Sequence, residues 1–150
     1  MEGKTNDHLQ VLREMRSRAV LGGGRKRIDQ QHARGKLTAR ERLALLLDEG
    51  SFQEFGALAT HQVSEFGLDQ QRFPGDGIVT GLGKIGGRRV AVFAQDFTVL
   101  GGSFSEVQAH KISRIQDLAL DSGIPLIGLN DSGGARIQEG VRSLAAYGEV

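Results

Sequence analysis

The sequence predicts an α/β fold whose C-terminal part is a strand-helix-strand-helix unit on a parallel sheet. Strand-type and helix-type segments alternate from Arg89 onward, and this alternation is typical of parallel strands joined by right-handed crossovers. Residues 125–130 are almost wholly apolar, which is typical of a strand buried on both faces. Glycine supplies 22 of the 150 residues, about twice its usual ~7% share, so the chain must use tight turns heavily.

Helix signals dominate the first 50 residues. Apolar residues recur at helical spacing over 7–20, and three consecutive glycines at 22–24 end this predicted amphipathic helix. A short basic helix is expected over 25–32, before Gly35. We therefore predict an N-terminal helical segment over residues 1–50.

Two capping boxes mark further helix starts. Residues 38–41 (Thr-Ala-Arg-Glu) have the spacing in which the Thr hydroxyl and the Glu carboxylate satisfy each other's backbone amides, and the leucine-rich helix that follows closes at Gly50. Residues 103–106 (Ser-Phe-Ser-Glu) predict the same device before a helix that ends near Gly123. A last helix is expected over 135–148.

The middle of the chain changes to strand periodicity. Residues 51–55, 78–80 and 89–93 are predicted strands. The run 81–86 matches G-x-G-x-x-G, but a dinucleotide fingerprint needs a helix to begin there. Here a strand follows, so the glycines at 86–87 are expected to form a hairpin turn.

Composition excludes several classes of protein. No apolar run approaches the ~20 residues of a membrane span, and the polar start lacks the apolar stretch of a secretory signal. The chain has no cysteine, and its four histidines lack ligand spacing, so no metal site is expected. One Tyr and no Trp make nucleic acid a poor candidate partner. We expect a cytoplasmic protein, or one of the mitochondrial matrix in a eukaryote.

The formal charge of +1 hides an asymmetry. Residues 1–42 carry a net charge of +6, and residues 43–150 carry −5. The basic part is either a solvated helical surface or a surface that faces an anionic ligand such as a nucleotide phosphate, and the charge count leaves both open.

Two glycine-rich loops are candidate site elements. Gly101, Gly102 and Ser103 precede one predicted helix, and residues 133–135 (Gly-Gly-Ala) begin another. In a parallel sheet both loops lie at the carboxyl ends of the strands, and free amides at a helix N-terminus bind an anion or a developing oxyanion. The glycines serve equally well for tight turns alone. A nucleophilic Ser132 is disfavoured, because the elbow glycine two residues before it is missing and no histidine follows.

Four stretches carry a resemblance to a known family. Residues 95–103 (QDFTVLGGS) and 130–141 (NDSGGARIQEGV) resemble the biotin-dependent acyl-CoA carboxyltransferases of the propionyl-CoA carboxylase beta and methylmalonyl-CoA carboxyltransferase type. Residues 35–42 and 76–81 match the family as well. The resemblance runs from about Leu9 to the last residue.

The resemblance implies a crotonase-like fold that moves a carboxyl group between carboxybiotin and the α-carbon of a short-chain acyl-CoA. It implies that the amides of Gly133, Gly134 and Ala135 hold the thioester oxyanion, and that residues 101–103 contact the substrate. Carboxybiotin comes from a biotinylated carrier or biotin carboxylase partner, so no cofactor is bound directly. For the phosphates of CoA we predict contacts to three basic residues, Arg25, Lys26 and Arg27.

Family members are several times longer than this chain. We therefore expect residues 51–150 to form the first part of the family's N-terminal domain, the chain to be an N-terminal fragment of an incomplete domain, and the full-length subunit to be a homo-oligomer. Activity of residues 1–150 alone is not expected to be complete. The alternative is a non-catalytic acyl-CoA-binding or assembly fragment.

Overall fold

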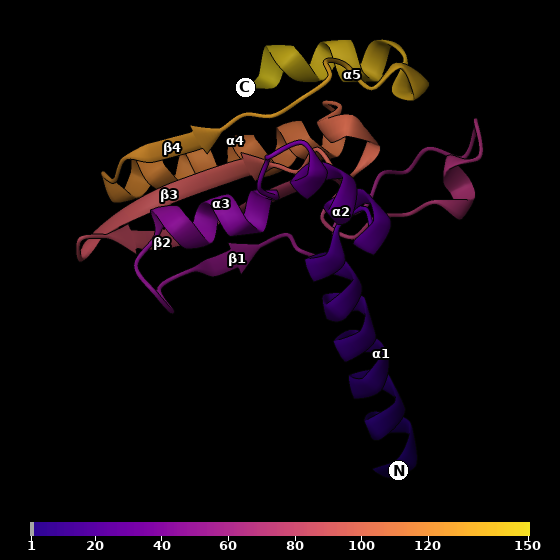
Figure 1. Cartoon of the computed structure of the whole chain (residues 1–150), viewed down its shortest axis with the longest axis horizontal. Helices are drawn as coiled ribbons and strands as arrows, with labels where there is room; N and C mark the ends of the chain where they lie inside the picture. Colours follow the sequence, from indigo (N-terminus) through magenta and orange to yellow (C-terminus); the bar gives the residue numbers. More distant parts are fainter. Residues whose placement is uncertain (1) are drawn as a thin grey trace.

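The computed structural model describes residues 2–150. Helix α1 projects from a body built on one sheet (Figure 1). Short 3-10 turns lie at Leu68–Gln70, Leu100–Gly102, Ile137–Glu139 and Tyr147–Glu149. The helices are α1 (Glu2–Leu21), α2 (Arg25–Ala33), α3 (Ala39–Leu46), α4 (Glu106–Ser122) and α5 (Val141–Ala146), and the strands are β1 (Gln53–Phe55), β2 (Ile78–Ile85), β3 (Arg88–Gln95) and β4 (Leu126–Leu129).

The four strands form one sheet in the order β1-β2-β3-β4. The first two pairings are antiparallel, and β3 pairs with β4 in parallel across the α4 crossover. The predicted parallel unit is thus confirmed for its β-α-β part. Ile85 pairs with Arg88 across the turn, which confirms the predicted hairpin at Gly86 and Gly87.

Helices cover both faces of the sheet. Val90, Val92 and Ala94 of β3 pack with α3 on one face. Ala91 packs with α4 on the other face. Side chains alternate between faces along a strand, so covering both faces requires the nearly continuous apolar sequence of β3.

Residues 125–130 contain the expected strand, but the expectation that it is buried on both faces is wrong. The strand spans Leu126–Leu129, and its side chains are half-buried or exposed. Within the described residues β4 pairs with β3 alone, so its other edge has no strand beside it. An apolar sequence reports a preference for burial, and an edge position leaves that preference partly unmet.

The helix ends follow local chemistry in one case and tertiary contacts in another. The capping box at Thr38 is confirmed, with the Thr38 hydroxyl accepting from the Glu41 amide and the Thr38 amide donating to the Glu41 carboxylate. That helix ends at Leu46, before Gly50. The capping box predicted at 103–106 is wrong, because α4 is capped by Ser105, whose hydroxyl accepts from the Gln108 amide. The division into residues 1–50 and 51–150 stays a prediction.

Candidate active site

The loops that follow β3 and β4 lie side by side, as the sequence predicted. The Gly133 amide donates to the Gly101 carbonyl at 2.9 Å. Further along both loops, the Phe104 amide donates to the Gly134 carbonyl at 2.7 Å, and the Arg136 amide donates to the Phe104 carbonyl at 2.8 Å. Three backbone hydrogen bonds therefore join the two glycine-rich loops directly.

Gly102 is the point of closest approach between the loops. Its φ of +64° is in the left-handed region, and a Cβ atom placed on it would lie 2.2 Å from the Asp131 carbonyl oxygen. Real side chains do not tolerate such a contact. The glycine is therefore required both by its backbone conformation and by the neighbouring loop.

The helix predicted over 135–148 is wrong at its start, and this changes the chemistry of the site. Ala135 is extended and forms an isolated parallel bridge with Phe104, and α5 begins only at Val141. The amides of residues 133–135 therefore do not form a helix N-terminus, and no helix dipole stands behind them. The reason is tertiary: pairing with Phe104 keeps this backbone extended where its sequence alone is compatible with a helix.

The three candidate amides of the loop differ in how far they are committed. Gly133 donates to Gly101, and Gly134 donates at 3.1 Å to the hydroxyl of Ser132. Across residues 2–150 the Ala135 amide has no hydrogen-bond acceptor. Gly134 has a φ of +107°, and a Cβ placed on it would meet nothing within 4 Å, so space beside it is open. The arrangement leaves one free donor, the Ala135 amide, and one donor held only by a local side chain, the Gly134 amide, beside open space.

Ser132 makes only a local turn. Its hydroxyl bonds the amide of Gly134 at 3.1 Å and the carbonyl of the same residue at 3.4 Å. Within the described chain no histidine or carboxylate contacts this hydroxyl. A nucleophilic serine needs such a base within hydrogen-bond reach, so the geometry does not support a serine hydrolase.

The glycines between α1 and α2 bring α2 against the loop that follows β3. The Gly23 amide donates to the Thr98 hydroxyl at 3.0 Å. A Cβ on Gly22 would lie 2.4 Å from the Asp96 carboxylate, and one on Gly23 would lie 1.8 Å from the Thr98 carbonyl oxygen. Close approach of the Thr98 backbone therefore requires glycine at position 23, whereas Gly22 is favoured by its φ of +52° and by the neighbouring Asp96 side chain.

This contact places basic residues of α2 beside the glycine loop. A cavity of about 130 Å³ separates them, and it is lined by Arg27, Gln30, Gln31, Arg34, Phe97, Thr98 and Gly101. Of the three basic residues predicted to hold CoA phosphates, Arg27 lies in this cavity, whereas Arg25 and Lys26 are exposed at the start of α2 and do not line it. Arg34 lines the cavity although sequence reasoning did not single it out.

Asp131 connects α2 to the second glycine loop, and sequence reasoning missed this role. Its carboxylate accepts from Lys36 at 3.1 Å and from Gln31 at 3.2 Å, and its amide donates to the Gln95 side chain at 3.2 Å. The Lys36 ammonium also lies 5.4 Å from the centre of the Phe97 ring. The positive charge of residues 1–42 gave a general signal for such a contact, but the partner depends on the fold.

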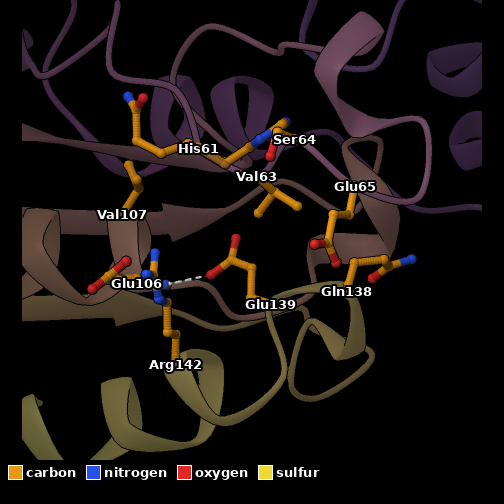
Figure 2. A pocket seen from close by; sticks show the side chains of 10 residues that line it. His61, Val63, Ser64, Glu65, Glu106, Val107, Gln138, Glu139 and Arg142 are labelled. Carbon is orange, nitrogen blue, oxygen red and sulfur yellow. Dashed lines mark hydrogen bonds between the residues drawn. The ribbon is translucent and has the colours of Figure 1, made fainter.

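A separate polar pocket of about 320 Å³ lies by the first turn of α4, and Figure 2 shows the side chains that line it. On its wall the Glu139 carboxylate accepts from the Glu106 amide at 3.0 Å. His61 is buried, and its Nε2 bonds the Gln71 carbonyl at 3.0 Å.

In the part of the chain that the structure describes, no three His, Asp or Glu side chains converge as a metal site would require. No helix among these residues is long and apolar enough to cross a membrane.

Lys111 is a buried titratable group whose pKa departs from the ordinary value. Burial lowers the pKa of Lys111 to about 8, although the nearby carboxylates of Glu54 and Asp76 oppose this change. The ammonium donates to the carbonyls of Gly75 and Ile78. This lysine therefore joins α4 to the backbone at the start of β2, and it forms no hydrogen bond to the glycine loops.

The sequence is similar to one known protein family and to several of its members. The carboxyl transferase domain model matches residues 30–150. The chain is 62% identical over 144 residues to the propionyl-CoA carboxylase beta chain of Roseobacter denitrificans, and 51% identical over 144 residues to the methylmalonyl-CoA decarboxylase subunit alpha of Veillonella parvula. Each alignment covers 96% of this chain and 28% of the relative, so the chain spans little more than a quarter of their length.

A solved structure shows the same similarity in three dimensions. Transcarboxylase 12S, described as a hexamer-forming multienzyme core with methylmalonyl-coenzyme A bound, superposes with a TM-score of 0.90 at 49% identity. The match covers 94% of this chain and 28% of that one. Together with the sheet and its two helical layers, this similarity confirms the predicted crotonase-like α/β class, represented by part of a domain.

Proposed function

Because the chain belongs to the carboxyl transferase family that includes propionyl-CoA carboxylase beta chains, we propose that it forms the acyl-CoA-binding part of a carboxyltransferase. The reaction transfers a carboxyl group between carboxybiotin and the α-carbon of a short-chain acyl-CoA. A biotinylated partner would bring carboxybiotin; loss of carbon dioxide from its ureido nitrogen would leave a group able to take up the α-proton, and the α-carbon would then add to that carbon dioxide. The residues of this chain bind the thioester and stabilise the enolate that forms when that proton leaves.

One observation carries the proposal: the family's glycine motifs meet beside an amide that has no acceptor among the described residues. The Ala135 amide, with that of Gly134 beside it, would donate to the thioester oxygen as negative charge develops there. Gly133 contributes by holding the two loops together through its bond to Gly101. The site needs no protein base, since the α-proton leaves to the biotin group.

The cavity beside Gly101 suits the other end of the substrate. Arg27 and Arg34 present positive charge next to the loop, and phosphate groups are bound well by guanidinium groups. We therefore assign the CoA phosphates to this side, with residues 101–103 between the phosphates and the thioester. Arg25 and Lys26 would act at longer range, as exposed charges.

The test uses the full-length subunit, by which we mean a subunit that contains this sequence and is as long as the relatives. Transfer of a labelled carboxyl group from a carboxylated biotin carrier to propionyl-CoA is measured by mass spectrometry of the thioester. Gly134→Val cannot adopt the φ of +107° and should lower turnover ~10²–10³-fold, the usual cost of losing one oxyanion donor. Acyl-CoA binding without any carboxyl transfer in the wild type would contradict the proposal and favour the non-catalytic alternative.

Two control variants separate the possible causes. Gly123→Val places valine at a similarly strained glycine, with φ of +63° and open space around it, at the far end of α4 and about 25 Å from the loops. It should leave turnover near the wild-type value. Ser132→Ala should retain most activity. Loss of turnover in Ser132→Ala, with activity preserved in Gly134→Val, would instead indicate a serine-based mechanism.

A further inference from the structure

Arg136 directly follows the proposed oxyanion residues, and its side chain is fully buried. The guanidinium donates to the Asp76 carboxylate at 2.7 Å and 2.9 Å, and to the Glu139 carboxylate at 3.0 Å. It also donates to the Asp76 carbonyl at 3.3 Å, and to the carbonyl and hydroxyl of Ser103 at 3.2 Å and 3.3 Å. All three guanidinium nitrogens are therefore engaged, and two of them reach the first glycine loop at Ser103.

Asp76 is the centre on which these contacts converge. It lies two residues before β2 begins at Ile78, it is fully buried, and its φ of +52° is unusual for a residue other than glycine. Besides Arg136, its carboxylate accepts from the Ser105 hydroxyl at 2.5 Å, and its carbonyl accepts from the Gln108 side chain at 3.0 Å. One residue thus connects the start of β2, the first turn of α4 and the loop after β4.

The charges in this cluster are balanced on both sides. The side chain of Glu139 is 4% exposed, and one of its oxygens accepts from Arg136. The other oxygen accepts from the Glu106 amide (Figure 2). The Lys111 ammonium is close enough to the Asp76 carboxylate to interact with its charge, and it donates to the carbonyl of the preceding residue, Gly75. A buried ion pair gives little net stability over an apolar replacement, because both charges lose water. Its value lies more in the geometry that it imposes.

We propose that Asp76 and Arg136 are positioning residues, which hold the segment 133–135 against the segment 101–103 at the separation needed for the oxyanion site. The proposal rests on the proposed function for its catalytic meaning. Both side chains are fully buried, so we assign neither of them a contact with the substrate. They act through Ser103 and through the backbone bonds of Gly133 and Phe104, which are the other ties between the loops.

The test compares Asp76→Asn with Glu54→Gln in the full-length subunit. Asparagine keeps the shape of Asp76 and tolerates a positive φ, but it lacks the negative charge that holds Arg136. Glu54→Gln is the control, because it also removes the charge from a two-point arginine pair, that with Arg40 at 2.7 Å and 2.8 Å, at a less buried position away from the glycine loops. Turnover, the Michaelis constant for propionyl-CoA, melting temperature and amide hydrogen exchange are measured for each.

For Asp76→Asn we expect turnover to fall about 10- to 100-fold with the Michaelis constant within about twofold, as a displacement near 1 Å produces. Exchange at the Gly133, Phe104 and Arg136 amides should rise at least about tenfold, while exchange in β3 stays unchanged. Glu54→Gln should lower the melting temperature without either effect. A loss of melting temperature in Asp76→Asn with normal turnover and normal exchange in the loops would overturn the proposal.

A second variant covers the case in which Asp76→Asn does not fold. Glu139→Gln weakens the same cluster at its less buried end and should shift turnover and loop exchange in the same direction by smaller factors. Wild-type turnover and wild-type exchange there would equally overturn the proposal. If the wild-type subunit transfers no carboxyl group, the proposed function fails, and the exchange measurements alone decide whether Asp76 and Arg136 hold the loops together.

Discussion

Replacing Gly102 by alanine tests whether the close approach of the two glycine loops sets the geometry of the site. A Cβ atom there would lie 2.2 Å from the Asp131 carbonyl oxygen, whereas ordinary contacts begin at 3.4 Å. The loops must therefore separate by about 1 Å to admit one methyl group. Overpacking of this kind costs about 1–3 kcal/mol, and the left-handed φ adds about 1–2 kcal/mol for any side chain. We expect a total loss of about 2–5 kcal/mol in unfolding free energy.

The neighbouring glycine supplies the control. Gly101 has nearly the same φ, +66° against +64°, but a Cβ on it would meet only the Phe97 ring at 4.0 Å. Gly101→Ala therefore carries the backbone cost of about 1–2 kcal/mol without the clash. The difference between the two variants isolates the contact between the loops.

The assays are urea unfolding and carboxyl transfer in the full-length subunit. A displacement near 1 Å at the site should lower turnover about 10²-fold in Gly102→Ala. Gly101 lines the cavity proposed for the CoA phosphates, so Gly101→Ala is compared at saturating acyl-CoA, where its turnover should stay within about tenfold of wild type. Equal effects of the two substitutions on turnover and stability would refute the reasoning, since backbone strain alone would then explain both.

Charge reversal of Arg25, Lys26 and Arg27 should raise the Michaelis constant for acyl-CoA more at low salt than at high salt, and an unchanged constant at every ionic strength would remove these residues from phosphate binding. The folded-state pKa of Lys111 is about 8, against 10.5 for an ordinary lysine. Between these pH values the unfolded state binds a proton that the folded state does not, so the free energy of unfolding should rise with pH across this window, by up to about 3 kcal/mol relative to Lys111→Met. Parallel curves of stability against pH for the two proteins would contradict this. Residues 1–150 alone should be marginally stable and prone to associate through the unpaired edge of β4, and a monodisperse monomer with a cooperative thermal transition would argue against that expectation.

The sequence alone determined those features that depend on neighbours along the chain. The Thr38 cap and the hairpin at Gly86 and Gly87 formed as predicted, because a capping box or a two-glycine turn needs no distant partner. The alternation of strand and helix from Arg89 to β4 predicted the parallel pairing correctly. That parallel pairing, together with the positions of the glycine motifs, placed two loops at adjacent strand ends.

Tertiary structure decided the features in which a distant partner outweighs local preference. Two serines lie near the start of α4, and Ser105 became the cap because its hydroxyl also reaches the buried Asp76, while Ser103 was drawn to Arg136. Ala135 and Arg136 were predicted to be helical, yet both are extended, because the Ala135 backbone pairs with Phe104 and the Arg136 side chain enters a buried ion pair. The sequence contains both halves of that pair, Asp76 and Arg136, but 60 residues separate them, and only the fold brings the charges together.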